Sequence, residues 1–346
     1  FETNDGVVVG VKDVSFDIKP GECVCVVGES GSGKSVSSLS LMRLVEFGGV
    51  TITNGKLMFD TGDGKVVDLV RQSTPVMRDI RGNQIGMIFQ EPMTALNPIR
   101  TIGDQVAETV LIHEKVSRSE ALARAREALD RVELPADRFP LNRYPHELSG
   151  GQRQRVVIAM AIALRPALLI ADEPTTALDV TTQAQILALL KRLVREDGMG
   201  LLMISHDLAV VADMADEIVI MKDGEVVERG ACPAIFSALK HPYSISLLEA
   251  STHAPDRSVH PMEDALLRVR DVVRTYTVPR KSLLSPAGKV AAVKGVSFDL
   301  KRGESLGLVG ESGCGKSTLT RAILGLEEVQ GGEILFDGQP VFDGHR

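Results

Sequence analysis

Two glycine-rich segments of this chain follow the pattern G-x-x-x-x-G-K-[ST], whose backbone N–H groups surround the phosphates of a bound nucleotide. The first segment consists of Gly28, Glu29, Ser30, Gly31, Ser32, Gly33, Lys34 and Ser35. The second consists of Gly310, Glu311, Ser312, Gly313, Cys314, Gly315, Lys316 and Ser317. In such a segment the lysine contacts the β- and γ-phosphates, and the final hydroxyl binds Mg²⁺, which prefers oxygen ligands. The first segment is therefore predicted to bind a nucleoside triphosphate, and the second can do so if its domain folds.

The residues that flank the first segment support this interpretation. An apolar run, Cys23–Val27, precedes the segment and is predicted to be a buried strand, and a helix-compatible stretch follows it. The start of that helix would add further N–H donors for phosphate. The alternative is a glycine turn that only connects a strand with a helix, but such a turn has no need for Lys34 and Ser35.

Two adjacent carboxylates follow another apolar run. Asp172 and Glu173 come directly after residues 168–171, and carboxylates at the end of a core strand are costly unless a metal or a reaction uses them. We assign Asp172 to Mg²⁺, through water, and Glu173 to the general base that polarises the water attacking the γ-phosphate. The alternative is a salt bridge at the end of the strand.

The predicted strands also bring distant residues together. Residues 200–204 form a further short apolar run, and buried parallel strands present their carboxyl ends at one edge of a sheet. Gly28, Asp172 and His206 are therefore predicted to lie at the same edge.

The segment Leu148, Ser149, Gly150, Gly151 and Gln152 precedes a predicted helix over residues 153–164. Ser149 is suited to cap this helix, and the two glycines leave its first N–H groups accessible. Taken alone, the segment is explained as a capped helix. Its position between a phosphate-binding segment and a pair of carboxylates makes a nucleotide-binding role more specific.

The chain contains a duplication, because residues 12–35 and 294–317 align without a gap and are identical at two thirds of their positions. We expect an α/β fold with one nucleotide-binding domain at 1–250, including a helical subdomain at about 92–148. A polar, proline-containing linker is predicted at 251–265, followed by the N-terminal part of a second domain at 266–346. Each copy is predicted to contain a strand, a Gly-Glu turn and a second strand before the glycine-rich segment.

Composition narrows the class of protein further. The 346 residues are 44% hydrophobic and 25% charged, as in a soluble globular protein, and the net charge of -7 argues against nucleic acid as a partner. We find no apolar stretch long enough to span a membrane and no secretory leader. The four cysteines lack the spacing of a zinc site or a disulfide framework.

The order of these motifs resembles the nucleotide-binding domain of ATP-binding cassette (ABC) proteins. That resemblance implies a phosphate-loop NTPase fold with a mixed-sheet core, a helical subdomain and an antiparallel β subdomain. It also implies that two domains enclose ATP, each contributing residues 148–152 to the site of the other. Gln90 matches the Q-loop residue that senses Mg²⁺ and water, Asp179 matches the D-loop, and His206 matches the switch histidine that contacts the γ-phosphate. From the residues alone, Ser205 or Asp207 could instead cap the next helix, with His206 as an ordinary strand-end residue.

The same resemblance bears on the base of the nucleotide. The family places an aromatic residue that stacks on the adenine some distance before the phosphate-binding segment. Phe1 in the first copy and Tyr276 in the second copy match that position.

Further segments, including residues 77–82, 88–98, 143–147 and 241–244, resemble the oligopeptide, dipeptide and nickel importers within this family. Among those, the fused ATPase subunits of glutathione importers match most closely. The resemblance implies an ATPase that uses Mg²⁺, at the cytoplasmic face of a bacterial inner membrane. Its implied partners are two transmembrane permease subunits, a periplasmic solute-binding protein and a second ATPase domain, for which we expect a homodimer. Some relatives carry an iron-sulfur cluster, but no cysteine lies between Cys232 and Cys314, so we expect none.

Two other classes of protein remain open at this stage. A soluble ABC ATPase of DNA repair, chromosome organisation or translation would have coiled coils, zinc cysteines or basic linker helices, and a phosphate-loop kinase or GTPase would not require residues 148–152. The second copy ends before any Q-loop, paired carboxylates or switch histidine. We therefore expect residues 266–346 to be poorly stable alone, because parallel strands need both faces covered.

Overall fold

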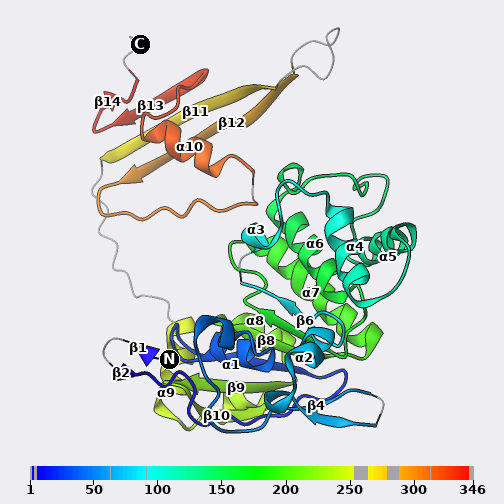
Figure 1. Ribbon diagram of the computed structural model, residues 1–346. Coiled ribbons are helices and arrows are strands. Elements are labelled where there is room, and N and C mark those ends of the chain that lie inside the picture. The colour runs from blue at the N-terminus through cyan, green and yellow to red at the C-terminus, as the bar shows by residue number, and fades with distance from the viewer. Residues whose placement is uncertain are drawn as a thin grey trace. The chain divides into compact units, whose positions relative to one another are not determined.

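The computed structural model describes residues 2–3, 6–62, 64–90, 92–252, 264–278, 288–311 and 313–342. The chain divides into two compact units, residues 1–178 with 182–253 and residues 254–346 with 179–181, and we describe each unit by itself (Figure 1). Phe1 and Ser312, which were predicted to contact nucleotide, lie outside the described residues, as does most of the predicted linker.

The first unit is built on a six-stranded sheet. Its strands are β3 (Cys23–Val27), β6 (Ile85–Ile88), β7 (Leu168–Asp172), β8 (Gly200–Ser205), β9 (Glu217–Lys222) and β10 (Glu225–Ala231). The strand order is β10-β9-β3-β8-β7-β6, in which β10 pairs antiparallel with β9 and all other neighbours are parallel. The strand before the first phosphate loop therefore lies between two parallel neighbours, and the three predicted strands are confirmed.

Both faces of this sheet are covered. Cys23, Cys25 and Val27 pack into one apolar cluster, whereas Val24 and Val26 pack into the other, because successive side chains of a strand point to opposite faces. The elements around the sheet are α1 (Lys34–Leu41), η1 (Val45–Gly48), η2 (Leu69–Arg71), α2 (Thr74–Ile80), α7 (Val180–Asp197), α8 (Leu208–Met214), η4 (Ala234–Ser237) and α9 (Pro242–Thr252). Because both faces are covered, the sequences of these strands are continuous apolar runs and do not alternate between apolar and polar residues.

Short hairpins complete the sheet content of the first unit. β1 (Glu2–Thr3) pairs with β2 (Gly6–Val7), and β4 (Met58–Asp60) pairs with β5 (Val66–Asp68), both antiparallel. The predicted strand that opens this copy does not form. Around residues 12–20 the structure has only an isolated bridge between Asp13 and Glu225.

The helical region comprises α3 (Pro92–Ala95), α4 (Ile102–His113), α5 (Arg118–Arg131), η3 (Pro145–Glu147) and α6 (Gly150–Ile162). α4, α5 and α6 pack against one another, and α6 contacts the edge strand β6 (Figure 1). α6 begins three residues earlier than the predicted start at 153, because Gly150 is already helical after its cap. The helical subdomain thus adjoins the sheet through the helix that follows residues 148–149.

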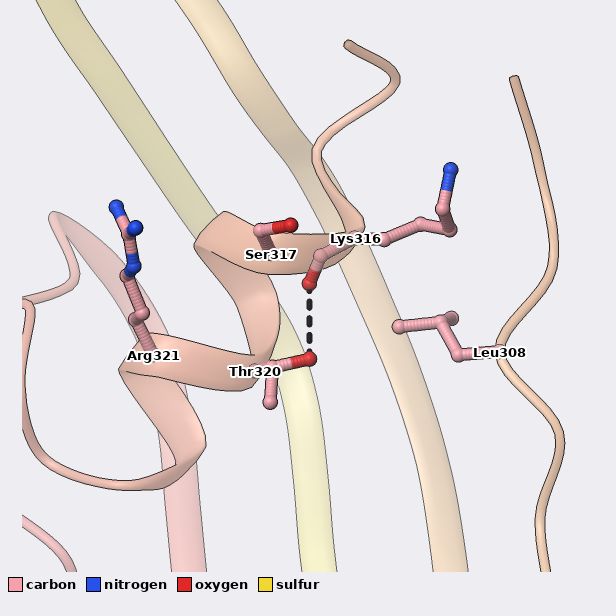
Figure 2. A pocket seen from close by; sticks show the side chains of 5 residues that line it. All are labelled: Leu308, Lys316, Ser317, Thr320 and Arg321. Atoms are coloured by element: carbon pink, nitrogen blue, oxygen red, sulfur yellow. Dashed lines mark hydrogen bonds between the residues drawn. The ribbon is translucent and has the colours of Figure 1, made fainter. Parts of the chain in front are cut away.

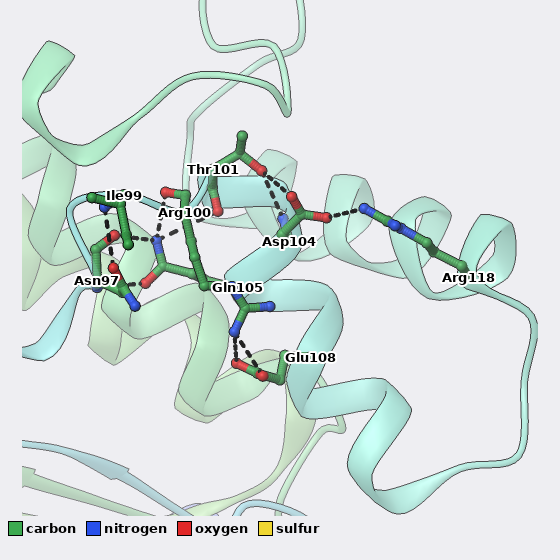
Figure 3. A network of polar contacts seen from close by, with 8 residues as sticks. All are labelled: Asn97, Ile99, Arg100, Thr101, Asp104, Gln105, Glu108 and Arg118. Atoms are coloured by element: carbon green, nitrogen blue, oxygen red, sulfur yellow. Dashed lines mark hydrogen bonds and ion pairs between the residues drawn. The ribbon is translucent and has the colours of Figure 1, made fainter.

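A buried glutamine fixes the turn between α3 and α4 (Figure 3). The Gln105 Nε2 donates to the carbonyls of Asn97 (3.1 Å) and Arg100 (3.0 Å), and its Oε1 accepts from the Asn97 N–H (2.8 Å). Thr101 caps α4 by accepting from the Asp104 N–H, as a threonine at a helix start commonly does. Because Gln105 is 3% exposed, these bonds satisfy a side chain that would otherwise be buried at a cost.

In its described residues, the second unit is an antiparallel sheet with one helix. Its elements are β11 (Ala265–Val278), β12 (Gly288–Lys301), α10 (Lys316–Ile323), β13 (Gly331–Phe336) and β14 (Gln339–Pro340), in the sheet order β12-β11-β13-β14. A small core that includes Val269, Val293, Leu319 and Ile334 joins the helix to the sheet.

The second unit departs from the sequence prediction at the strand before its phosphate loop. Residues 305–309, which align with β3, form no strand. Val309 is 88% exposed, whereas the aligned Val27 is fully buried. The physical reason is that β3 is hydrogen-bonded on both sides by β8 and β9, and the described part of the second unit pairs no strand with 305–309.

Candidate functional site

The first phosphate loop connects β3 with α1 and depends on two glycines. A Cβ on Gly28 would lie 2.2 Å from the carbonyl oxygen of Met221 on β9, and a Cβ on Gly33 would lie 2.6 Å from that of Gly10. Gly33 also has a φ of 98°, in the left-handed region that favours glycine. These two positions leave space only for backbone, which brings the loop close to the sheet edge and to the first turn of α1.

Lys34 is buried and contacts the first phosphate loop. Its ammonium donates to the carbonyls of Gly28 and Glu29, at 2.7 Å each, and to the Ser32 hydroxyl at 3.4 Å. Burial lowers the pKa of Lys34 from its ordinary value, and the neighbouring carboxylates Glu173 and Asp172 oppose that shift. Lys34 has exchangeable partners within the loop, and it can turn from these carbonyls to the oxygens of a phosphate.

Ser35 and Asp172 form a pair of oxygen ligands next to this lysine. The Ser35 hydroxyl donates to Asp172 Oδ1 at 3.2 Å, although the two residues are 137 positions apart. Burial raises the pKa of the Asp172 carboxyl, and the hydrogen bond from Ser35 opposes the shift. A hydroxyl and a buried carboxylate in contact are the ligand types that Mg²⁺ prefers, so the residues present fit this ion.

Glu173 is the centre of the polar network at the end of β7. Its Oε2 accepts from Gln90 Nε2 at 3.1 Å and from the Thr176 hydroxyl at 2.9 Å, and its Oε1 lies 3.1 Å from His206 Nδ1. Burial alone would raise the pKa of Glu173, but the hydrogen bonds from His206 and Thr176 outweigh it, and the pKa is lowered. Glu173 is therefore held as an anion, which is the form that accepts a proton from water.

The sheet order brings these residues together. Gln90 lies two residues beyond β6, Glu173 follows β7 and His206 follows β8, and these three strands are adjacent and parallel. Glu173 has a φ of 46°, and its N–H donates to the Ile204 carbonyl at 3.0 Å, which ties it to the neighbouring strand. The predicted juxtaposition of Gly28, Asp172 and His206 at one edge follows from the same order.

The helix after His206 is capped by the next residue. Asp207 accepts hydrogen bonds from the N–H groups of Ala209 (2.9 Å) and Val210 (3.3 Å) at the start of α8. The Ser205 hydroxyl accepts from the Asp207 N–H instead. Of the two capping residues considered from sequence, Asp207 is the cap, which leaves the His206 ring to contact Glu173.

Ser149 caps α6, as predicted. The Ser149 hydroxyl accepts from the Gln152 N–H at 3.4 Å, and the Gln152 side chain accepts from the Ser149 N–H at 3.0 Å, which is a reciprocal capping box. Gly151 has little room, since a Cβ there would lie 2.3 Å from Thr182 Cγ2, whereas a Cβ on Gly150 would meet only Leu178 at 3.6 Å.

The structure does not join residues 149–152 to the first phosphate loop. In the described part of the chain, the hydrogen bonds of Ser149 and of the Gln152 side chain stay within the helix start. Asp179 directly precedes α7. The proposed contact of these residues with a nucleotide therefore requires a second domain, and it stays a prediction.

The lysine of the second phosphate loop also contacts two loop carbonyls, because Lys316 donates to those of Gly310 and Glu311. Figure 2 shows a pocket lined by Lys316 together with Leu308, Ser317, Thr320 and Arg321. Gly313, Cys314 and Gly315 complete the described loop, with the Cys314 thiol exposed.

Tyr276 already has polar partners within the second unit. Its hydroxyl donates to Glu327, and the Arg274 guanidinium lies 4.8 Å from the ring centroid. One face of the predicted base-stacking aromatic is thus in contact with a cation.

Sequence reasoning missed two residues that contact this site. Thr176 donates to Glu173, and its only signal was its place three residues after that carboxylate. The Tyr243 hydroxyl accepts from the Glu29 N–H at 2.9 Å, within the first phosphate loop. Tyr243 stands in the segment 241–244 that had been noted only for its family resemblance.

This fold and this site define a phosphate-loop nucleotide-binding domain: a glycine loop with a buried lysine, a serine-aspartate pair, and a carboxylate held by a glutamine and a histidine. The model of the family described as "ABC transporter" matches residues 11–176 and 293–346. The chain belongs to the ABC transporter family.

Curated relatives match nearly the whole chain. The glutathione import ATP-binding protein GsiA of Shigella sonnei (strain Ss046) is 47% identical over 360 residues, which cover 96% of this chain and 58% of the relative. The protein of the same name from Escherichia coli (strain K12) is 46% identical with the same coverage. The chain thus spans 58% of the length of these relatives.

Solved structures agree with the fold. The dimeric structure of the ATP-binding cassette MJ0796 in a post-hydrolysis state, bound to ADP and Pi, aligns with a TM-score of 0.58 and 33% identity. The alignment covers 67% of this chain and 94% of the MJ0796 chain. The cbiO1 protein of Clostridium perfringens, part of the ABC transporter complex cbiONQ, aligns at 24% identity and a TM-score of 0.57, which supports the fold alone.

None of the helices in the described ranges has the length and apolar character to cross a membrane. Within the same residues, no cluster of three or more histidine, cysteine or acidic side chains could hold a metal ion.

Proposed function

We propose that this chain hydrolyses ATP and supplies the energy for a bacterial ABC importer of peptides, with glutathione as the candidate solute. Glutathione enters the proposal because the similar GsiA proteins carry the printed name "glutathione import ATP-binding protein". Residues 1–250 are the first ATPase domain, with 92–148 as its helical subdomain, and 266–346 correspond to the N-terminal part of a second domain.

The observation that carries the proposal is the position of Glu173. Gln90, Thr176 and His206 all contact its carboxylate, and Asp172 beside it contacts Ser35 of the phosphate loop. The β- and γ-phosphates of ATP contact Lys34 and the loop N–H groups, and Glu173 accepts the proton of the attacking water. Ser35, Gln90 and Asp172, the last through water, would hold Mg²⁺, which would supply charge stabilisation at the phosphates. His206 orients the reacting γ-phosphate from the neighbouring strand.

A second ATPase domain completes the site. Ser149, Gly150, Gly151, Gln152 and Asp179 of one copy contact the nucleotide bound to the loop of another copy, so that the active form is a homodimer. The dimeric state of the MJ0796 cassette supports this arrangement. The capped, glycine-rich start of α6 offers backbone N–H groups that suit an anion.

The partners follow from the importer class. Two transmembrane permease subunits bind this chain at the cytoplasmic face of the inner membrane, and a periplasmic solute-binding protein delivers the solute to them. ATP binding closes the two domains and hydrolysis reopens them, because the closed and open states differ in their affinity for the nucleotide.

Substitution of the proposed base tests the chemistry. Glu173→Gln keeps the hydrogen-bonding shape but cannot accept the proton, so we expect ATPase turnover to fall by about 10²- to 10⁴-fold with ATP binding retained. Glu127→Gln is the matched control, because Glu127 pairs with Arg165 on the exposed surface of the helical region. Unchanged hydrolysis by the Glu173→Gln variant would remove the assignment of the base.

A second experiment tests the transport role. Co-purification from a membrane extract should recover permease proteins, and a screen of peptides and glutathione on that complex should identify a solute that stimulates hydrolysis. ATP hydrolysis without association with any membrane protein would favour a soluble member of the family.

A further inference from the structure

The peptide group between Gly28 and Glu29 is held from both sides. Its carbonyl oxygen, on Gly28, accepts from Lys34 Nζ at 2.7 Å. Its N–H, on Glu29, donates to the Tyr243 hydroxyl at 2.9 Å. Tyr243 lies 214 residues further along the chain, in the first turn of α9. The entry to the phosphate loop is thereby tied to an element outside the sheet.

The tyrosine itself is firmly placed. Its side chain is 8% exposed and packs into the apolar cluster on one face of the sheet. The Lys222 ammonium lies 5.0 Å from the ring centroid, at the end of β9. The preceding residue on that strand, Met221, is the one whose carbonyl excludes a side chain at Gly28. Ring, strand and loop therefore fix the position of the hydroxyl.

The turn before α9 is anchored by a single carboxylate. Glu228 on β10 accepts from the N–H of Lys240 at 2.8 Å and from that of His241 at 3.3 Å. The His241 Nδ1 in turn accepts from the Tyr243 N–H at 3.2 Å. A continuous set of hydrogen bonds thus connects β10, through the segment 241–243, with the phosphate loop.

A bound nucleotide would affect the two contacts of the Gly28–Glu29 peptide group, the one from Lys34 and the one to Tyr243, in different ways. When Lys34 contacts a phosphate, it has to give up at least one of its three bonds within the loop, two of which are to the carbonyls of Gly28 and Glu29, because an ammonium has only three donors. The Tyr243 contact lies on the other side of the peptide and is unaffected. Tyr243 then keeps the loop in the shape that the phosphates require.

We propose that Tyr243 is a positioning residue for nucleotide binding, which holds the Gly28–Glu29 peptide while Lys34 contacts phosphate. The proposal rests on the proposed function, because it assumes that the first loop binds ATP and ADP. It assigns a role to the segment 241–243, to which the proposed function gives none.

Calorimetric titration of the full chain with MgADP tests the proposal. Tyr243→Phe removes the hydroxyl but keeps the buried ring, and we expect the affinity for MgADP to fall by about 3- to 10-fold, the worth of one hydrogen bond. Ser246→Ala is the matched control: it deletes a hydroxyl in the same helix whose bond, at 2.8 Å, is to the Tyr243 carbonyl and not to the loop. Thermal melts establish that both variants are folded.

Kinetics distinguish positioning from a general loss of structure. Tyr243→Phe should raise KM for ATP by a similar factor and leave kcat unchanged within about two-fold, because the bond acts equally on bound substrate and transition state. Glu228→Ala should lower the affinity in the same direction. In the double variant, the two losses should not add, because both act through one set of contacts.

The possible outcomes separate this proposal from the proposed function. If the unaltered chain fails to bind MgADP, the proposed function is wrong. If the unaltered chain binds and Tyr243→Phe binds equally well, the positioning role is wrong while the proposed function stands. A loss of kcat with unchanged affinity would also overturn the positioning role.

Discussion

The two copies of the strand-loop segment allow a matched test of what the sheet contributes. Val27 and Val309 occupy equivalent positions before the two phosphate loops, and the same substitution, valine to alanine, can be made at each. Val27 is fully buried between β8 and β9, whereas Val309 is 88% exposed. Any difference between the variants therefore reports burial rather than residue type.

The expected magnitudes follow from that difference. Val27→Ala removes two buried methyl groups, each worth about 0.8 kcal/mol in transfer free energy, and leaves a cavity, so we expect a loss of about 2–3 kcal/mol. In a unit of this size, 1 kcal/mol shifts Tm by about 2–4 °C, which predicts a decrease of about 4–12 °C. Val309→Ala should cost less than about 0.5 kcal/mol and move no transition by more than about 2 °C.

Scanning calorimetry of the full chain without nucleotide is the assay, since it resolves the transitions of both units. Hydrogen exchange read by peptide mass supplies a local measure, with β3 protected and residues 305–309 exchanging fast. A decrease in Tm for Val309→Ala as large as that for Val27→Ala would refute the reasoning, because it would mean that residues 305–309 are buried as a strand.

The remaining predictions concern the site and the helical region. Gly151→Ala should lower Tm through the contact with Thr182, and Thr182→Ser in the same chain should restore it; no rescue would show that the clash is not the cause. Asp104 tests pH dependence: the hydrogen bond from Thr101, together with the ion pair to Arg118, lowers the pKa of this carboxyl (Figure 3). Its stabilisation is thus complete above the unfolded pKa of about 3.9 and is lost as pH falls through the lower folded value. Urea unfolding at a series of pH values should show a shallower acid loss for Asp104→Asn than for the unaltered chain, and identical slopes would contradict this account.

Several features could be predicted from local sequence because short-range physics decides them. The run Cys23–Val27 is a strand, and Ser149 caps α6 through a reciprocal bond with Gln152. A serine three residues before a glutamine at a helix start needs no distant partner to form that cap. The left-handed backbone at the start of α1 is likewise a conformation that the glycine at position 33 favours.

One of the two strand predictions that failed shows the limit of local patterns. Residues 305–309 align with β3 but form no strand, since a strand exists only where neighbouring backbones supply its hydrogen bonds. The aligned residues also differ, because Ser305 and Gly307 stand where β3 has Cys23 and Cys25, and a glycine inside a strand weakens it.

The phosphate loops, their glycines, and the pair Asp172 and Glu173 at the end of an apolar run could be identified from the amino-acid sequence, because each depends on residues that are close along the chain. The fold was needed to show which side chains converge on Glu173 and that Tyr243 reaches the Glu29 N–H. Those contacts join segments up to 214 residues apart, and they depend on strand order and helix placement, which no local spacing specifies.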